Sequence, residues 1–313
     1  MTKRLLDPKD IPQSLWNGDE LLLLPQSLKD AYHKTLKKRE LLEEAREARS
    51  EGDIGGRSEA ATAQHFARRF SSSCARVELV VLDPKDELSN ASDYFLRVFS
   101  GGRVRLLDIP CGSGAASATL LTTVAELRRQ NIIPREPLEI FLTGGDVSDD
   151  ARDNARLIFN ELRPALYDQG IFLEVSLEPW DVFDPQSMTG LLNKWLTNSP
   201  ECNKSFLFIA NVSGLLGSDN NFKKAKERLG EVFRWVMEYK STVVWIEPQT
   251  RKARGMSLLK SFGELFSRLI SKPNNPEQTN EQLTSEAKFT HPIRRDSHHP
   301  VRLLLVRLER HIP

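Results

Sequence analysis

The residues best suited to chemistry lie in one short stretch, where an acidic side chain precedes a glycine loop. Asp108 ends an apolar run, and Gly112 and Gly114 complete the pattern Asp-x-x-x-Gly-x-Gly. Glycines at these places let the backbone approach a ligand, because a Cβ would collide with the ligand or the turn. A strand that feeds a helix through such a loop presents backbone N–H groups and a helix N-terminus, which suit a nucleotide-like ligand.

The dinucleotide fingerprint Gly-x-Gly-x-x-Gly is incomplete in this stretch. Counted from Gly112, the place of the third glycine is taken by Ser117. That glycine allows close packing between helix and strand in nicotinamide-binding domains. The sequence therefore disfavours a nicotinamide-dependent oxidoreductase, although a glycine turn of another α/β protein still fits the loop taken by itself.

Further polar side chains follow other apolar runs along the chain. Asp146 stands in Gly-Gly-Asp-Val-Ser, Asp181 in Glu-Pro-Trp-Asp-Val, Asn211 in Ala-Asn-Val-Ser and Glu247 in Trp-Ile-Glu-Pro. Ligands of open α/β sheets bind outside the carboxyl ends of the strands, so these residues are candidates for the same site. The alternative for Asp146 is capping of the next helix, a role that Ser148 already suits.

Composition narrows the possible partners. The chain has 313 residues and a net charge of +1, with 44 Lys and Arg against 43 Asp and Glu, so a nucleic-acid partner would need a local basic patch. Its cysteines, Cys74, Cys111 and Cys202, are far apart and form no metal or disulfide pattern. No apolar run has the length of a membrane span, and the first residues lack the hydrophobic region of a signal peptide. We expect a cytoplasmic protein without a metal site or a membrane partner.

The elements that must position these residues alternate between strand and helix from residue 103 onward. Most of the strands are continuous apolar runs, which is typical of parallel strands buried on both faces. The expected strands are 104–109, 138–143, 171–177, 206–211 and 242–247, followed by 287–294 and 301–308. The expected helices between them are 115–130, 149–163, 221–238 and 256–270.

Residues 1–100 are expected to be mainly helical. Apolar spacing predicts helices over 27–49, 58–74 and 91–99, with a glycine-rich break at 50–56. We therefore divide the chain into an N-terminal helical region, 1–100, and an α/β domain, 101–313.

The Asp-x-x-x-Gly-x-Gly loop, five βα units and a terminal hairpin together resemble the class I S-adenosylmethionine (SAM)-dependent methyltransferases over about residues 58 to 310. The resemblance implies an α/β fold with a seven-stranded, mostly parallel sheet, helices on both faces, a terminal antiparallel hairpin and a helical N-terminal extension. It also implies SAM as cofactor and methyl transfer as activity. A SAM-binding regulatory protein without transfer activity is the alternative.

The resemblance assigns a role to each candidate residue. Asp108 would contact the methionine end of the cofactor, Asp146 both ribose hydroxyls, and Asp181 the adenine amino group. The whole implied cofactor site is Asp108, Pro110, Cys111, Gly112, Ser113, Gly114, Asp146, Val147, Asp181, Val182 and Asn211. The Cys111 thiol is expected to pack rather than to act as a nucleophile.

Asn211 and Glu247 are the candidate catalytic residues. In base-modifying amino methyltransferases the residue at the place of Asn211 is often followed by Pro-Pro-aromatic, which is missing here, so methylation of a nucleobase amine is in doubt. In-line methyl transfer needs alignment and exclusion of water more than a strong base.

The methyl acceptor does not follow from these motifs, but one cluster of cations suggests its charge. The turn from Arg294 to Pro300 carries Arg294, Arg295, His298 and His299, and the resemblance places it at the mouth of the site. With His65, Arg68 and Arg69 opposite, it would suit an anionic acceptor, either a small molecule or RNA. The alternative is a solvated turn whose arginines pair with nearby acids.

Overall fold

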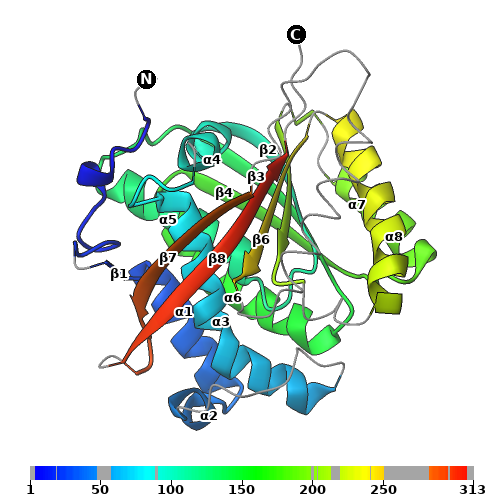
Figure 1. Ribbon diagram of the computed structural model, residues 1–313, viewed down its shortest axis with the longest axis horizontal. Coiled ribbons are helices and arrows are strands. Elements are labelled where there is room, and N and C mark those ends of the chain that lie inside the picture. The colour runs from blue at the N-terminus through cyan, green and yellow to red at the C-terminus, as the bar shows by residue number, and fades with distance from the viewer. Residues whose placement is uncertain are drawn as a thin grey trace.

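The computed structural model describes residues 4–18, 20–47, 58–88, 91–198, 201–202, 204–212, 219–239, 241–249, 282–294 and 297–308 (Figure 1). The predicted helix 256–270 and the break at 50–56 lie outside these residues. Among the described helices, none is both long and apolar enough to span a membrane.

A single mixed sheet forms the centre of the protein, with the strand order β1-β7-β8-β6-β5-β2-β3-β4 (Figure 1). β8 runs antiparallel to its neighbours β6 and β7, and every other pair is parallel. The strands are β1 (Leu21–Leu22), β2 (Gly102–Asp108), β3 (Leu138–Asp146), β4 (Ile171–Pro179), β5 (Lys204–Ala210), β6 (Ser241–Pro248), β7 (Gln282–Thr290) and β8 (His298–Leu308). The predicted fold class is confirmed, and the two-residue strand β1 adds an eighth strand to the expected seven.

The boundaries predicted for the terminal hairpin are wrong. β7 begins at Gln282 and ends at Thr290, whereas the prediction placed this strand at 287–294. Along β7 the side chains alternate, with Ala287 and Phe289 buried and Glu286 and Lys288 exposed. A strand with one solvated face contains no continuous apolar run, so the search for such runs missed its first half.

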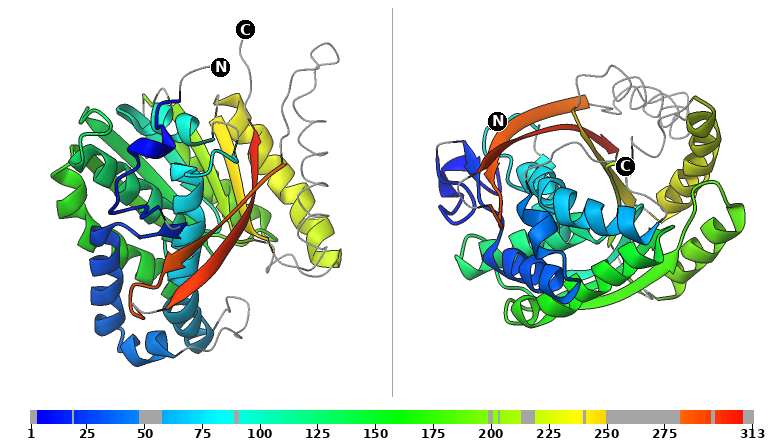
Figure 2. Two further views of the ribbon diagram at one scale, coloured as in Figure 1. Left: turned by 60° about the vertical axis from the view of Figure 1, so that its left-hand side comes forward. Right: turned by 90° about the horizontal axis from the view of Figure 1, so that it is seen from below.

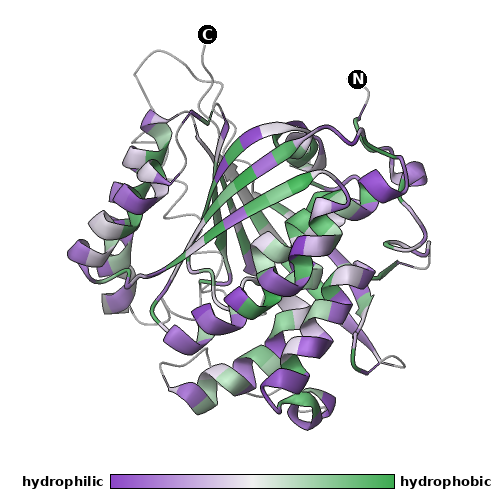
Figure 3. Cartoon of the chain, turned by 180° about the vertical axis from the view of Figure 1, so that it is seen from behind, coloured by the Kyte–Doolittle hydropathy of each residue, from purple (hydrophilic) through white to green (hydrophobic). Residues whose placement is uncertain are grey.

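Helices cover both faces of the sheet. The helices of the α/β domain are α5 (Ala115–Arg129), α6 (Asp149–Tyr167), α7 (Pro185–Thr197) and α8 (Asp219–Glu238). α5 and α6 share one hydrophobic cluster with the N-terminal helices, while α7 and α8 enclose a second cluster on the opposite face (Figure 2). The strands are mainly hydrophobic and the outer helix surfaces largely hydrophilic, as expected for a three-layer α/β protein (Figure 3).

The N-terminal region is helical, but its boundaries differ from the prediction. It contains the 3-10 turn η1 (Pro8–Asp10) and the helices α1 (Gln26–Lys38), α2 (Leu42–Arg46), α3 (Glu59–Leu82) and α4 (Ala91–Phe99). The single helix expected over 27–49 is interrupted where Glu40 takes a left-handed backbone conformation, with φ of 58°. α3 continues eight residues beyond the predicted end, because its last two turns are almost entirely buried and show no amphipathic stripe.

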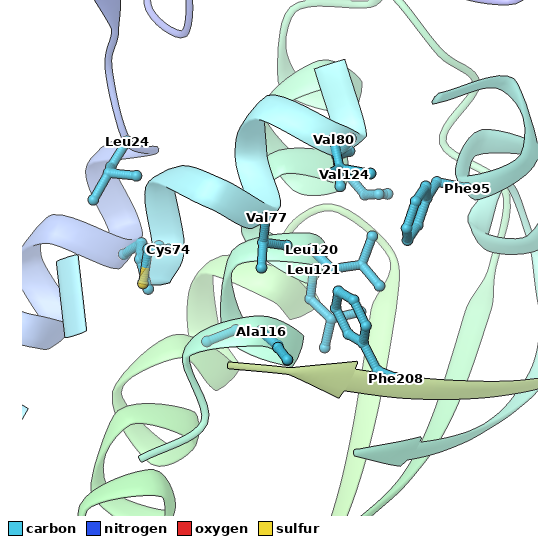
Figure 4. Packing of buried hydrophobic residues seen from close by; sticks show 14 of the residues in the cluster. Leu24, Cys74, Val77, Val80, Phe95, Ala116, Leu120, Leu121, Val124 and Phe208 are labelled. Atoms are coloured by element: carbon cyan, nitrogen blue, oxygen red, sulfur yellow. The ribbon is translucent and has the colours of Figure 1, made fainter. Parts of the chain in front are cut away.

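α3 packs into the same core as the sheet. Its first half carries Phe66 and Phe70, which contact the ring of Tyr32 from α1 at centroid distances of 5.4 and 4.9 Å. Its second half packs on α5 and α4, within a hydrophobic cluster that contains Val77, Val80, Phe95, Leu120, Leu121, Val124 and Phe208 (Figure 4). The N-terminal helices are therefore built into the hydrophobic core and do not merely rest on it.

This packing predicts the effect of a core truncation in α3. Phe66→Ala should lower the free energy of unfolding by about 3–5 kcal/mol, because it removes a buried ring and leaves a cavity beside Tyr32. Urea denaturation measures this. Tyr167→Ala is the matched control: Tyr167 is 66% exposed, and the change should stay within about 0.5 kcal/mol. Equal effects of the two substitutions would show that α3 is not part of the core.

Candidate functional site

The carboxyl ends of β2, β3 and β5 meet at one edge of the sheet. β2 has β3 on one side and β5 on the other, so the direction of chain progression reverses at β2. Such a switch point leaves a crevice between the loops that leave the two strands, and ligands of open α/β sheets bind there. The structure thus brings the loop after Asp108, the turn after Asp146 and the segment at Asn211 to the same edge.

Asp146 links the two loops on one side of this crevice. One of its carboxylate oxygens accepts a hydrogen bond from the N–H of Gly112 at 3.0 Å, and the other accepts from the N–H of Ser148 at 2.9 Å. Burial raises the pKa of Asp146, and these two hydrogen bonds work in the opposite direction. Ser148 caps α6 by accepting from the N–H of Ala151, so Asp146 is not needed as the helix cap.

Asp108 lies at the end of β2 and is almost completely buried. Its Oδ2 accepts a hydrogen bond from Ser117 Oγ at 2.6 Å, whereas its buried Oδ1 has no partner in the described part of the chain. Burial raises the pKa of Asp108 to about 7, with a smaller contribution from Asp146, and the bond from Ser117 offsets part of this rise. Sequence reasoning treated Ser117 only as a missing glycine and overlooked this bond.

The two loop glycines are required for different reasons. Both have positive φ, +51° at Gly112 and +81° at Gly114. A Cβ on Gly114 would lie 3.0 Å from the ring of Phe159 in α6, so that glycine permits packing between helices. A Cβ on Gly112 would meet nothing within 4 Å, so the loop faces open space there.

The Cys111 side chain packs beneath this loop, as expected. A Cβ added to Gly144 of β3 would lie 3.1 Å from the Cys111 sulfur, which shows how closely the thiol covers the strand. Burial, followed by the nearby carboxylates Asp146 and Asp108, holds the pKa of the Cys111 thiol well above its ordinary value. Cys111 therefore stays a neutral thiol and is not an activated nucleophile.

Asp181 follows β4, beside the turn that contains Asp146. The N–H of Trp180 donates to the Asp146 carbonyl at 3.0 Å, and Asp181 itself accepts from the N–H of Phe183. Trp180 and Val182 are buried in the cluster on the α7 face. Asp184 caps α7 by accepting from two backbone N–H groups, and Pro185 starts that helix.

Asn211 and Glu247 lie close together at the ends of β5 and β6. Asn211 has φ of 59°, and its side-chain oxygen accepts a hydrogen bond from Arg76 Nε of α3 at 3.0 Å. Glu247 is buried and accepts from the N–H of Val212 at 2.8 Å and from Trp245 Nε1 at 2.6 Å. Sequence reasoning missed Arg76, because α3 was expected to end before it. The sequence also allowed an ion pair of Glu247 with Arg251, a residue that lies outside the described part of the chain.

The cationic cluster predicted at the hairpin is only partly assembled. Arg68 forms ion pairs with Glu44 at 2.6 Å and Glu47 at 3.2 Å, so it turns toward α2. Arg294 donates to the Glu47 carbonyl at 3.4 Å, which docks the hairpin turn on the end of α2. His299 is bonded to Ser297. The remaining arginine of the turn, at position 295, lies outside the described residues.

The described residues of this site offer polar groups that suit the binding of a ligand. Within the described ranges no cluster of three or more His, Cys, Asp or Glu side chains could hold a metal ion. The crevice offers two acidic residues, a glycine loop and an amide-guanidinium pair instead. Such groups suit a ligand with hydroxyl, amino and carboxylate functions.

Comparison with known proteins finds similar solved structures. The chain is similar in structure to a protein from Listeria monocytogenes described as a class I S-adenosylmethionine-dependent methyltransferase, with 13% identity and a TM-score of 0.34. The similarity covers 91% of this chain and 87% of that chain. No family model and no curated protein matches the sequence. The strand order, with antiparallel β8 between β7 and β6, agrees with the mostly parallel sheet and terminal hairpin that the sequence predicted.

The buried carboxyl of Asp108 predicts a pH dependence of stability. Its pKa is raised to about 7 in the folded protein, so the native state holds this proton where the unfolded chain has released it. The stability that it contributes is present below about pH 4 and is lost as the pH rises toward about 7. Asp108→Asn should remove this loss, which urea denaturation across that range would measure. A constant difference between wild type and variant would contradict the assignment.

The two loop glycines predict contrasting substitution effects. Gly114→Ala should destabilise the fold by about 2 kcal/mol or more, because it combines a positive φ with a clash against Phe159. Gly112→Ala should cost only about 1 kcal/mol, from its backbone conformation alone. Thermal and urea unfolding of the two variants test this. Equal losses of stability would mean that the space beside Gly112 is filled.

Proposed function

We propose that this protein is a SAM-dependent methyltransferase whose cofactor lies at the carboxyl edge of β2, β3 and β4. The observation that carries the proposal is the convergence of Asp108, Gly112 and Asp146 at the switch point of the sheet. In a fold of this topology, those three positions face the two ends of an adenosyl amino acid.

The described residues fit such a cofactor in three respects. The buried Oδ1 of Asp108 has no partner among them, so it can accept from the amino group of the methionine end. The space beside Gly112 leaves room for the chain of the ligand. Val147 is 40% exposed beside Asp146, and an adenine ring would cover this apolar side chain.

Asp146 is the residue that we assign to the ribose. Each of its oxygens accepts one backbone N–H, and a carboxylate oxygen has a second lone pair for a hydroxyl. The two backbone bonds hold the carboxylate in place before a ligand arrives, so little side-chain entropy is lost on binding. Asp181 remains the proposed partner of the adenine amino group.

The bound cofactor would supply a methyl group that its sulfonium already activates. The protein's task is then to position an acceptor and to exclude water. Asn211 stands at the end of β5 with its amide held by Arg76, so it is the side chain proposed to orient the acceptor. Glu247 fixes the segment after Asn211 through the N–H of Val212 and serves as a positioning residue.

An oxidoreductase is less well supported. Ser117 occupies the place of the third fingerprint glycine, and its hydroxyl is used by Asp108. The antiparallel strand β8 is also foreign to the all-parallel nucleotide fold.

Isothermal titration with SAM and, separately, with NAD tests the cofactor assignment. Wild type should bind SAM and not NAD, and Asp146→Ala should weaken SAM binding at least tenfold, because each charge-assisted hydrogen bond contributes about 1.5–3 kcal/mol. Asp153→Ala is the matched control, since its exposed carboxylate on α6 pairs with Arg156 of the same helix. Unchanged SAM affinity in Asp146→Ala would show that Asp146 does not bind the ribose.

Catalysis is tested apart from binding. Tritium from methyl-labelled SAM should enter one fraction of a cell extract separated into RNA, protein and small molecules. SAM binding without transfer into any fraction would favour the regulatory alternative.

A further inference from the structure

Three basic side chains line one face of α3. His65, Arg69 and Arg76 are spaced by four and seven residues, which places them on the same side of a helix. This face, which we call the α3 stripe, extends about 16 Å along the helix axis. Electrostatic coupling joins its members, because Arg69 and Arg76 both help to lower the pKa of His65, after the larger effect of burial.

The α3 stripe runs along the proposed cofactor crevice. Near its start, the Thr62 hydroxyl lies 3.1 Å from the Ser148 hydroxyl, two residues from Asp146. At its far end, Arg76 donates to Asn211 at the end of β5. The stripe therefore extends from the ribose side of the crevice to the side where an acceptor would meet the methyl group.

Arg76 is a partly buried cation whose hydrogen bonds within the described residues go to neutral groups. Its Nε donates to the amide oxygen of Asn211 at 3.0 Å and its Nη2 to Ser73 Oγ at 3.2 Å. Burial lowers the pKa of Arg76 to about 10, and Glu247 is the nearby group that most favours its charged form. Glu247 therefore supplies a nearby opposite charge, and its Oε1 accepts from the N–H of Val212 and from Trp245 Nε1.

A guanidinium in this position is built to receive an anion. A guanidinium has five N–H donors, and the bonds described above use one on Nε and one on Nη2. Within the described residues the Nη1 donors make no hydrogen bond, so they can bind a carboxylate or phosphate, which arginine binds in a bidentate fashion.

We propose that the methyl acceptor is a small carboxylate or phosphate compound whose anionic group is bound by Arg76 of the α3 stripe beside Asn211. This inference rests on the proposed function and adds the substrate class to it. It replaces the hairpin turn as the acceptor-binding element, because Arg294 is docked on α2.

The surroundings of the α3 stripe favour a small acceptor over RNA. The net charge of the chain is +1, and the neighbouring basic residue Arg68 is neutralised by Glu44 and Glu47. A nucleic-acid strand needs several phosphate contacts along a continuous basic surface. One partly buried guanidinium suits a single anionic group.

The test uses the full chain saturated with S-adenosylhomocysteine, so that the cofactor site is filled. Thermal unfolding is followed during titration with sodium phosphate, with sodium succinate and with a short single-stranded RNA, each at constant ionic strength. Phosphate or succinate should raise Tm with a saturable midpoint. In Arg76→Gln this midpoint should increase at least tenfold. The midpoint of Arg76→Lys should lie between those of wild type and Arg76→Gln.

Arg97→Gln is the matched control. Arg97 lies on α4, and its side chain is 63% exposed and pairs with Asp93. Its backbone carbonyl accepts a hydrogen bond from Lys204 at the start of β5, which places Arg97 at the opposite edge of the sheet from the crevice. This variant should titrate like wild type.

The outcomes distinguish failure of the proposed function from failure of the acceptor proposal. If wild type does not bind S-adenosylhomocysteine in isothermal titration, the proposed function fails. If it does bind, and neither phosphate nor succinate gives a midpoint that depends on Arg76, the acceptor proposal is overturned. Stabilisation by the RNA alone would overturn it in favour of a nucleic-acid acceptor.

Discussion

One carboxylate holds the edge of the sheet together. Asp146 accepts the N–H of Gly112 from the loop after β2 and the N–H of Ser148 at the start of α6. These bonds join segments that leave neighbouring parallel strands, and they keep the glycine loop folded back against β3. The remaining parts of the site are arranged around this junction: Asp108 below it, Cys111 packed against Gly144, and the crevice beside Gly112.

The second constraint is that α3 is shared between the core and the site. One side of the helix packs on Tyr32 through Phe66 and Phe70, while another carries the α3 stripe along the crevice. A helix fixed by such packing holds its polar side chains without large conformational freedom, which lowers the entropic cost of binding. The position of Arg76 thus depends on the same contacts that stabilise the fold.

Much of this architecture could be predicted from the sequence, because buried parallel strands and capped helices leave local signals. The apolar run before Asp108, the cap at Ser148 and the Asp184-Pro185 start of α7 all mark their elements. The end of α3 could not be placed, because helical turns buried on nearly all sides show no amphipathic pattern. The start of β7 could not be placed, because a strand with one solvated face contains no continuous apolar run.

The candidate site divides in the same way. Acids at strand ends are visible in the sequence because strand ends can be located, so the positions of Asp108 and Asp146 at the edge of the sheet could be predicted. Arg76 depends on a contact across 135 residues with Asn211, and no local pattern reveals such a contact. The role of Ser117 was hidden for a related reason, since its partner Asp108 is defined only once the strand and helix are packed.

The dual use of α3 links ligand binding to the stability of the helix itself. A ligand that binds only the folded state increases the free energy of unfolding of the segment to which it binds. Arg76 belongs to a helix that is part of the core, so ligand binding should stabilise a large cooperative unit rather than a single loop. Ligand binding at Arg76 should therefore slow amide hydrogen exchange throughout α3, including the turns around Phe66 and Phe70, which lie away from the proposed site.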